Sequence, residues 1–128
     1  MGENYSHAAS RLRHDAKKLA SGGRFQNAGY LIGLAAECLV KEILENAAVT
    51  IDRQSDLRHH FPTLVKKITS KGHGRFMGAL MSILQSNFLN NWQIELRYEE
   101  NSDAANAQEQ WRNWETDVDG LFRAAGKI

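Results

Sequence analysis

Glutamate, lysine, histidine and arginine stand at a few places in this sequence where their chemistry could serve a reaction. Glu37 and Lys41 lie four residues apart with the glutamate first, a spacing that favours an ion pair on one helix face. Arg58, His59 and His60 follow one another directly. A histidine titrates near neutral pH, so His59 or His60 suits a general base or a phosphate donor. These groups point to acid–base or phosphate chemistry.

The stretch Asn-Trp-Gln-Ile-Glu-Leu-Arg-Tyr-Glu-Glu-Asn, residues 91–101, adds an arginine in an unusual setting. Apolar and polar residues alternate along it, which is the period of an extended segment. The apolar members would anchor a connection onto the protein: Trp92, Ile94, Leu96 and Tyr98. Arg97 would then face the other way, where its planar fork of donors suits a carboxylate or a phosphate.

Each of these features also has a purely structural interpretation. Glu37 with Lys41 is compatible with a solvated ion pair, the two histidines with loop residues, and the Trp92 segment with packing alone. The Glu37–Lys41 pair gains weight because its helix is predicted to be enclosed, where charges need further partners or line a cleft. Cys38 has no second cysteine nearby and no activating context, which disfavours a catalytic thiol.

Apolar residues at helical spacing predict the elements that position these side chains. Five helices are expected, over about 5–20, about 25–47, 62–71, about 75–86 and from 101–103 to just before Gly126. The second is apolar on most sides, so it should be central in the domain. Its Gly29, Gly33, Ala36 and Val40 form a small-residue ridge that would let a neighbouring helix pack closely. The predicted fold is all-α: an up-and-down bundle of about five helices, with an extended connection before the last helix.

Composition limits the function classes. The 128 residues suit a single domain, and a formal charge of +1 supplies no global field for nucleic acid, so any such binding needs a local patch. One cysteine and no apolar run of membrane length favour a cytoplasmic protein that does not engage a membrane. No P-loop, zinc-type spacing or Gly-x-Ser-x-Gly elbow occurs, so neither a cofactor nor a metal is expected.

Three segments of the sequence form a combined pattern: Arg24–Lys41 with its Ala-Ala-Glu-Cys-Leu-Val-Lys ending, a His-x-Phe-x-x-Leu that starts at His59, and Trp92 before Arg97-Tyr98. Together they resemble the HEPN family (higher eukaryotes and prokaryotes nucleotide-binding domains). The resemblance covers most of the chain and implies a bundle of four to five helices, commonly a homodimer. It also implies a metal-independent endoribonuclease of toxin–antitoxin, CRISPR or antiviral (phage) defence systems, or a nucleotide-binding or scaffolding module. Many members pair with a minimal nucleotidyltransferase partner protein.

Under this resemblance, His59, His60 and Arg97 are the candidate catalytic residues. Glu37, Lys41, Arg97 and Tyr98 are the candidate nucleotide- or RNA-binding residues. The family nucleases carry Arg, four to six residues, then His near the last helices, but Ser102, Asp103 and Ala104 stand at the matching positions after Arg97. Arg53 with His59 or His60 satisfies the spacing in another part of the chain.

Three hypotheses follow from this departure. The first is a HEPN-like nucleotide- or RNA-binding component of a prokaryotic toxin–antitoxin or defence system. The second is an active metal-independent endoribonuclease with a displaced Arg/His set, in which His59 or His60 is the base for the ribose 2′-OH and Arg97 the cation for the phosphate. The third is a non-catalytic helical dimerisation scaffold.

Overall fold

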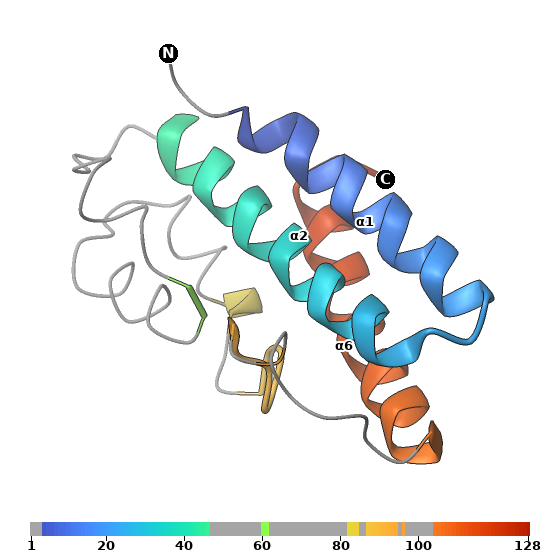
Figure 1. Ribbon diagram of the computed structural model, residues 1–128. Coiled ribbons are helices and arrows are strands. Elements are labelled where there is room, and N and C mark those ends of the chain that lie inside the picture. Colours follow the sequence, from blue (N-terminus) through green and yellow to red (C-terminus); the bar gives the residue numbers. More distant parts are fainter. Residues whose placement is uncertain (1–3, 47–59, 62–81, 85–86, 95, 97–103) are drawn as a thin grey trace.

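In the computed structural model, the described residues are 4–46, 60–61, 82–84, 87–94, 96 and 104–128 (Figure 1). They contain three α-helices and no strand: α1 (Tyr5–Ser21), α2 (Phe25–Asn46) and α6 (Ala104–Ala124). α1 and α2 form an antiparallel hairpin, and α6 runs alongside α2 in the same direction. The all-α prediction is confirmed for these residues.

Local sequence signals define the helix ends. The Asn4 side chain accepts a hydrogen bond from the His7 amide at 3.0 Å and caps α1. At the other end Gly23 has φ +81°, and the Arg24 amide donates to the Leu19 carbonyl at 2.9 Å. This is a Schellman stop, in which glycine takes the left-handed conformation that other residues avoid.

α6 ends in the same type of glycine C-cap. Gly126 has φ +75°, its amide donates to the Arg123 carbonyl at 3.0 Å, and the Lys127 amide donates to the Phe122 carbonyl at 2.9 Å. The predicted limits of the first, second and last helices are therefore confirmed to within a residue or two. The predicted helices over 62–71 and about 75–86 lie outside the described residues, except for a short helical piece at 82–83.

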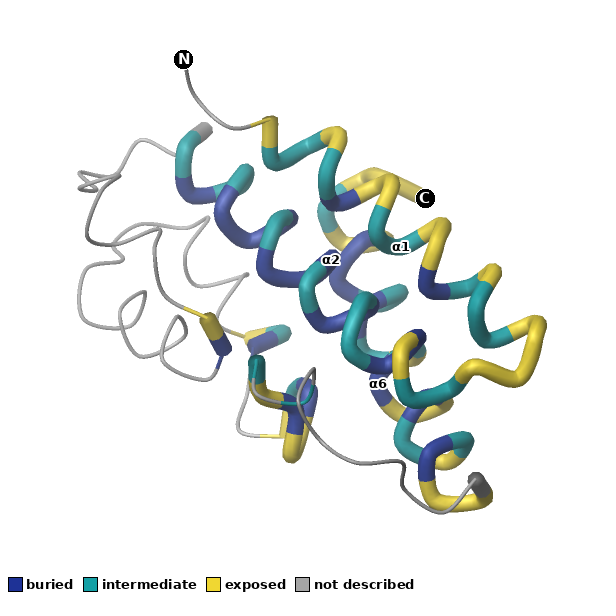
Figure 2. Tube along the Cα trace, in the orientation of Figure 1, coloured by how far each residue is buried: buried dark blue, intermediate teal, exposed yellow. Residues whose placement is uncertain are grey.

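The prediction that α2 is enclosed is confirmed. Dark-blue buried residues follow α2 along its length and mark one face of α6, while α1 is more exposed (Figure 2). The α2 residues in the core are mainly small or branched: Ala28, Ile32, Ala35, Ala36, Leu39, Val40 and Leu44. No helix in the described part of the chain is long and apolar enough to cross a membrane.

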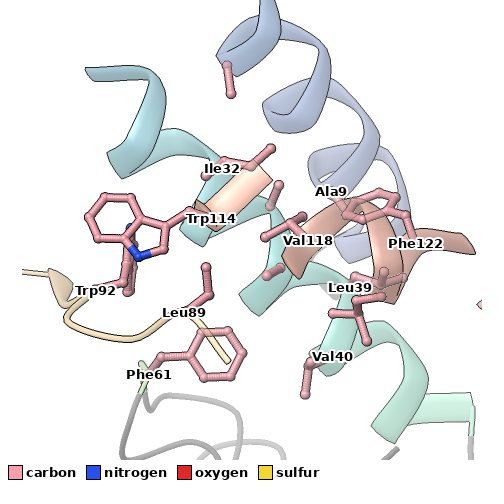
Figure 3. Close-up of a cluster of buried hydrophobic side chains, with 14 of the residues drawn as sticks. Ala9, Ile32, Leu39, Val40, Phe61, Leu89, Trp92, Trp114, Val118 and Phe122 are labelled. Carbon is pink, nitrogen blue, oxygen red and sulfur yellow. The ribbon is translucent and has the colours of Figure 1, made fainter. Parts of the chain in front are cut away.

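Two tryptophans of the same chain occupy the small-residue ridge of α2. The Trp92 indole N–H donates to the Gly29 carbonyl at 2.9 Å, and its ring lies where a side chain at Gly33 would be. A Cβ at Gly29 would come within 2.8 Å of Trp114. The ridge therefore lets the neighbouring helix α6 pack closely at Gly29 through Trp114, as predicted, and at Gly33 it receives the ring of Trp92, which lies outside the helices. Figure 3 shows Phe61, Leu89 and Trp92 gathered at one side of α2.

The predicted extended connection is wrong for its described residues, 91–94 and 96. The Trp92 amide donates to the Leu89 carbonyl at 2.9 Å and the Leu96 amide to the Gln93 carbonyl at 3.1 Å, which are bonds of turns and 3₁₀ structure. The alternation of apolar and polar residues reflects which side chains are buried and not an extended backbone, since Trp92 is buried and Gln93 is exposed. The indole bond to α2 fixes Trp92 inward and bends the chain around it.

α1 and α6 are joined by ion pairs. Arg13 Nε lies 2.9 Å from Asp119, and Lys17 Nζ lies 2.8 Å from both Glu115 and Asp119. Burial would raise the pKa of Asp119, but hydrogen bonds and charge from Lys17 and Arg13 outweigh it, so the pKa is lowered. Burial likewise would lower the pKa of Lys17, but the two carboxylates raise it.

Gly33→Ala should destabilise the protein by about 1–3 kcal/mol, because its methyl group would overlap the Trp92 ring and force an overpacked core to shift. Gly120→Ala in α6 is the matched control, since a Cβ there meets nothing within 4 Å. It should stabilise by about 0.5–1 kcal/mol through helix propensity. Urea unfolding of both variants checks this, and equal destabilisation would contradict the packing of Trp92 on Gly33.

Asp119→Asn should lower the free energy of unfolding at pH 7 by up to about 1 kcal/mol, the worth of partly exposed ion pairs. A lowered pKa means that the stabilisation is complete above the ordinary value of 3.8 and is lost as the pH falls through the folded-state pKa. The difference between wild type and variant should therefore shrink in acid. Urea titrations at pH 7 and below 3.8 measure it, and the exposed Asp15→Asn should change little at either pH. A difference independent of pH would refute the ion-pair assignment.

Candidate functional site

The best-formed polar site among the described residues surrounds the carboxylate of Glu37. This side chain projects from the middle of α2 and is only 2% exposed. Its Oε1 lies 2.7 Å from His60 Nδ1, and its Oε2 accepts a 2.7 Å hydrogen bond from the Phe61 amide. Both oxygens of a buried carboxylate are therefore engaged, as burial of a charge requires.

Aromatic packing places His60 and Phe61 against α2. The Phe61 ring is buried and meets Phe88 edge-on at 5.9 Å and Trp92 at 6.5 Å between centroids. Trp92 in turn stacks on Tyr30 of α2 at 6.3 Å. Because Phe61 is anchored by these contacts, the position of the preceding His60 is restricted. The His60 side chain is nevertheless 44% exposed.

The pKa of Glu37 is raised above its ordinary range by burial. The hydrogen bonds from His60 and the Phe61 amide, together with the charge of Lys41, oppose this rise without cancelling it. A raised pKa makes the carboxyl a stronger proton acceptor than a surface glutamate.

A carboxylate on Nδ1 defines what the imidazole can do. It stabilises the tautomer with hydrogen on Nδ1, leaves Nε2 to accept a proton, and stabilises the imidazolium that results. His60 is thus arranged as a general base whose ring is partly open to a substrate.

Lys41 lies one turn further along α2 and is also buried, at 8% exposed. No hydrogen bond or ion pair joins it to Glu37 in the described part of the chain, so the predicted i,i+4 ion pair is not formed. Its Nζ instead lies 5.8 Å from the centroid of the Tyr5 ring, a cation–π arrangement. The ammonium acts on Glu37 through its charge alone.

The structure therefore brings together some of the predicted site residues. Glu37 and His60 are in contact, and Lys41 is near enough to influence the Glu37 pKa. The remaining predicted site residues, His59, Arg97 and Tyr98, lie outside the described residues, as does Arg53.

Two members of the site escaped the sequence analysis. The Phe61 amide is a backbone donor, so its role cannot be inferred from the residue type. Tyr5 comes from the start of α1, far from Lys41 in the sequence. A signal existed only for the carboxylate, because a glutamate in the middle of an enclosed helix needs partners from elsewhere in the chain.

Among the residues that the structure describes, no group of three or more His, Cys, Asp or Glu side chains could hold a metal ion. No protein-family model, curated protein or solved structure matches this chain.

Replacing Glu37 by Gln should lower the population of the Nδ1–H tautomer of His60, because a carboxamide can donate to Nδ1 as well as accept from it. Nitrogen-15 NMR of the imidazole measures the tautomer at pH above its titration. Glu37→Leu should also destabilise the fold by about 1–3 kcal/mol, since the buried Phe61 amide loses its acceptor. An unchanged His60 tautomer in Glu37→Gln would show that the carboxylate does not set the ring.

Proposed function

We propose that the protein is a HEPN-like nucleotide- or RNA-binding component of a prokaryotic toxin–antitoxin or phage-defence system. The observation that carries the proposal is the 2.7 Å contact between the buried Glu37 carboxylate and the half-exposed His60 imidazole. Glu37 lies in the Ala-x-Glu-Cys-x-x-Lys segment, and His60 and Phe61 lie in the His-x-Phe segment that starts at His59, both parts of the HEPN resemblance. His60 is the unspecified position of that segment, and the Phe61 amide is bonded to Glu37 as well.

Charge decides how RNA would approach this site. A free carboxylate would repel phosphate, but the Glu37 oxygens face His60 and the Phe61 amide. Glu37 therefore holds the imidazole rather than touching RNA itself. The phosphate contact is assigned to Arg97, with Tyr98 beside it, because a guanidinium binds a phosphate through two donors at once. Lys41 supplies positive charge nearby.

An active metal-independent endoribonuclease is the second candidate, and the Glu37–His60 contact favours it specifically. In this reaction His60 Nε2 removes the proton of a ribose 2′-OH, and the 2′ oxygen attacks the adjacent phosphorus. The bond to the 5′ oxygen breaks, and that oxygen takes a proton from water. The products are a 2′,3′-cyclic phosphate and a 5′-hydroxyl. Arg97 would stabilise the charge on the phosphate in the transition state.

The proposal includes the finer architecture expected from the sequence, a five-helix bundle that forms a homodimer and works with a minimal nucleotidyltransferase partner. The small-residue ridge gives no support to the dimer, because Trp92 and Trp114 already fill it. A helical scaffold that only dimerises is the remaining alternative. The contact of the buried carboxylate with the half-exposed His60 imidazole favours the first two candidates over it, although the bond to the Phe61 amide would serve a scaffold as well.

Single-stranded RNA offered at low salt without metal should bind the wild-type protein. Arg97→Ala should weaken binding by ~1–3 kcal/mol, the worth of a charge-assisted contact. If the protein also cleaves RNA, His60→Ala should abolish cleavage. His14→Ala is the matched control, because His14 is exposed on α1 away from Glu37. Fluorescence anisotropy measures binding, and gel analysis of end-labelled RNA measures cleavage.

Each result separates the hypotheses. Binding without cleavage supports the binding component, and cleavage lost only in His60→Ala supports the ribonuclease. Absence of RNA and nucleotide binding at low salt, in a protein that is folded by circular dichroism, would leave the scaffold.

A further inference from the structure

The turn formed by residues 87–91 is held against α6 by two hydrogen bonds. The Leu89 amide donates to Asp117 Oδ2 at 3.0 Å, and the Trp114 indole N–H donates to the Asn90 carbonyl at 2.9 Å. Leu89 has φ 50°, a left-handed conformation that leucine rarely adopts, and its side chain is buried. A residue keeps such a conformation only where tertiary contacts fix it. The two bonds to α6 are contacts of this kind.

The same part of the chain carries the rings that hold Phe61 in place. Phe88, in the turn, meets the Phe61 ring edge-on at 5.9 Å between centroids. Trp92, directly after the turn, meets it edge-on at 6.5 Å. Figure 3 shows Phe61 beside Leu89 and Trp92. Because the Phe61 ring is buried and the core is closely packed, its position follows that of the turn.

The position of Phe61 decides whether both oxygens of Glu37 are engaged. The Phe61 amide donates to Oε2 at 2.7 Å, and the preceding His60 places its Nδ1 2.7 Å from Oε1. Hydrogen bonds weaken steeply once their distance and angle depart from the optimum. A displacement of about half an ångström is enough to loosen a site of this kind. The Glu37–His60 contact is therefore more sensitive to a shift of Phe61 than the apolar packing around the ring.

We propose that Asp117 of α6 is a positioning residue for His60. Its carboxylate fixes the turn at 87–91, the rings in and after this turn fix Phe61, and Phe61 fixes the preceding histidine against Glu37. A carboxylate suits the first step because it accepts a stronger hydrogen bond from a backbone amide than a neutral oxygen does. This positioning role rests on the function proposed for His60, and it adds a residue of α6 to the Glu37–His60 site.

Nitrogen-15 NMR of the His60 ring tests the positioning role without RNA. The ring signals are identified by their loss in His60→Ala, and Glu37→Gln gives their positions when the carboxylate is removed. In Asp117→Ala, the signals should move from the wild-type positions toward those of Glu37→Gln. In Asp117→Asn they should stay near wild type, because a carboxamide oxygen still accepts from the Leu89 amide. Asp117→Ala should fold, because the lost bond is only partly buried and water can replace the acceptor.

Hydrogen exchange of the Phe61 amide gives a second readout, because this amide is bonded to α2. Asp117→Ala should speed its exchange about tenfold, through local opening of the segment, while the amides in the middle of α2 change much less. Glu115→Ala is the matched control, since it removes another acidic residue of α6, one that pairs with Lys17 of α1. It should weaken the packing of α1 on α6 without selectively exposing the Phe61 amide.

Three results would overturn the positioning role. They are wild-type His60 signals in folded Asp117→Ala, failure of Asp117→Asn to keep the wild-type signals, and equal effects of Asp117→Ala and Glu115→Ala on the exchange of the Phe61 amide. Absence of RNA binding by the wild-type protein would refute the function proposed for His60 but would leave these NMR results standing, so the two failures are distinguishable.

Phe88→Leu keeps the positioning role testable if Asp117→Ala does not fold. It retains the hydrogen bonds of the turn to α6 but removes the ring that meets Phe61 edge-on. The His60 signals should again move toward those of Glu37→Gln. Wild-type signals in this variant would show that the turn does not set the histidine, and would overturn the role of Asp117.

Discussion

The packing of Trp92 against Gly29 and Gly33 of α2 is the contact on which the segments beside α2 depend. Its ring fills the space that Gly33 leaves open, and its N–H bonds the Gly29 carbonyl. This fixes the segment that follows the turn at 87–91, and the same ring forms part of the wall against which Phe61 packs. Two glycines in a helix cost roughly 1 kcal/mol each, and the close approach of an aromatic ring offsets that loss.

The buried carboxylate of Glu37 depends on that packing. A glutamate at this depth is tolerated only where donors reach it, and they come from a backbone amide and a histidine that Phe61 holds in place. The raised pKa of Glu37 shows that the compensation is incomplete. Burial disfavours its ionised form, and the same carboxyl both accepts from the Phe61 amide and contacts the His60 ring.

Sequence patterns predicted the helices because their signals are local. Asn4 caps α1, and Gly23 and Gly126 stop α1 and α6 through backbone conformations that depend on a few neighbouring residues. The contact of His60 with Glu37 could be expected only in outline, because it joins residues 23 positions apart. The extended connection was predicted wrongly for its described residues, because an alternation of apolar and polar residues reports which side chains are buried and not the backbone conformation. The backbone around Trp92 forms hydrogen-bonded turns, while its indole is bonded to α2.

Trp92 also connects the Glu37–His60 contact with the turn at 87–91. On one side its ring meets Phe61, next to the histidine that Glu37 orients, and on the other its amide closes the turn that carries Asn90 and Asn91. A single tryptophan packed on two glycines of α2 thus links the segment that carries His60 and Phe61 to the turn at 87–91, which is hydrogen-bonded to α6.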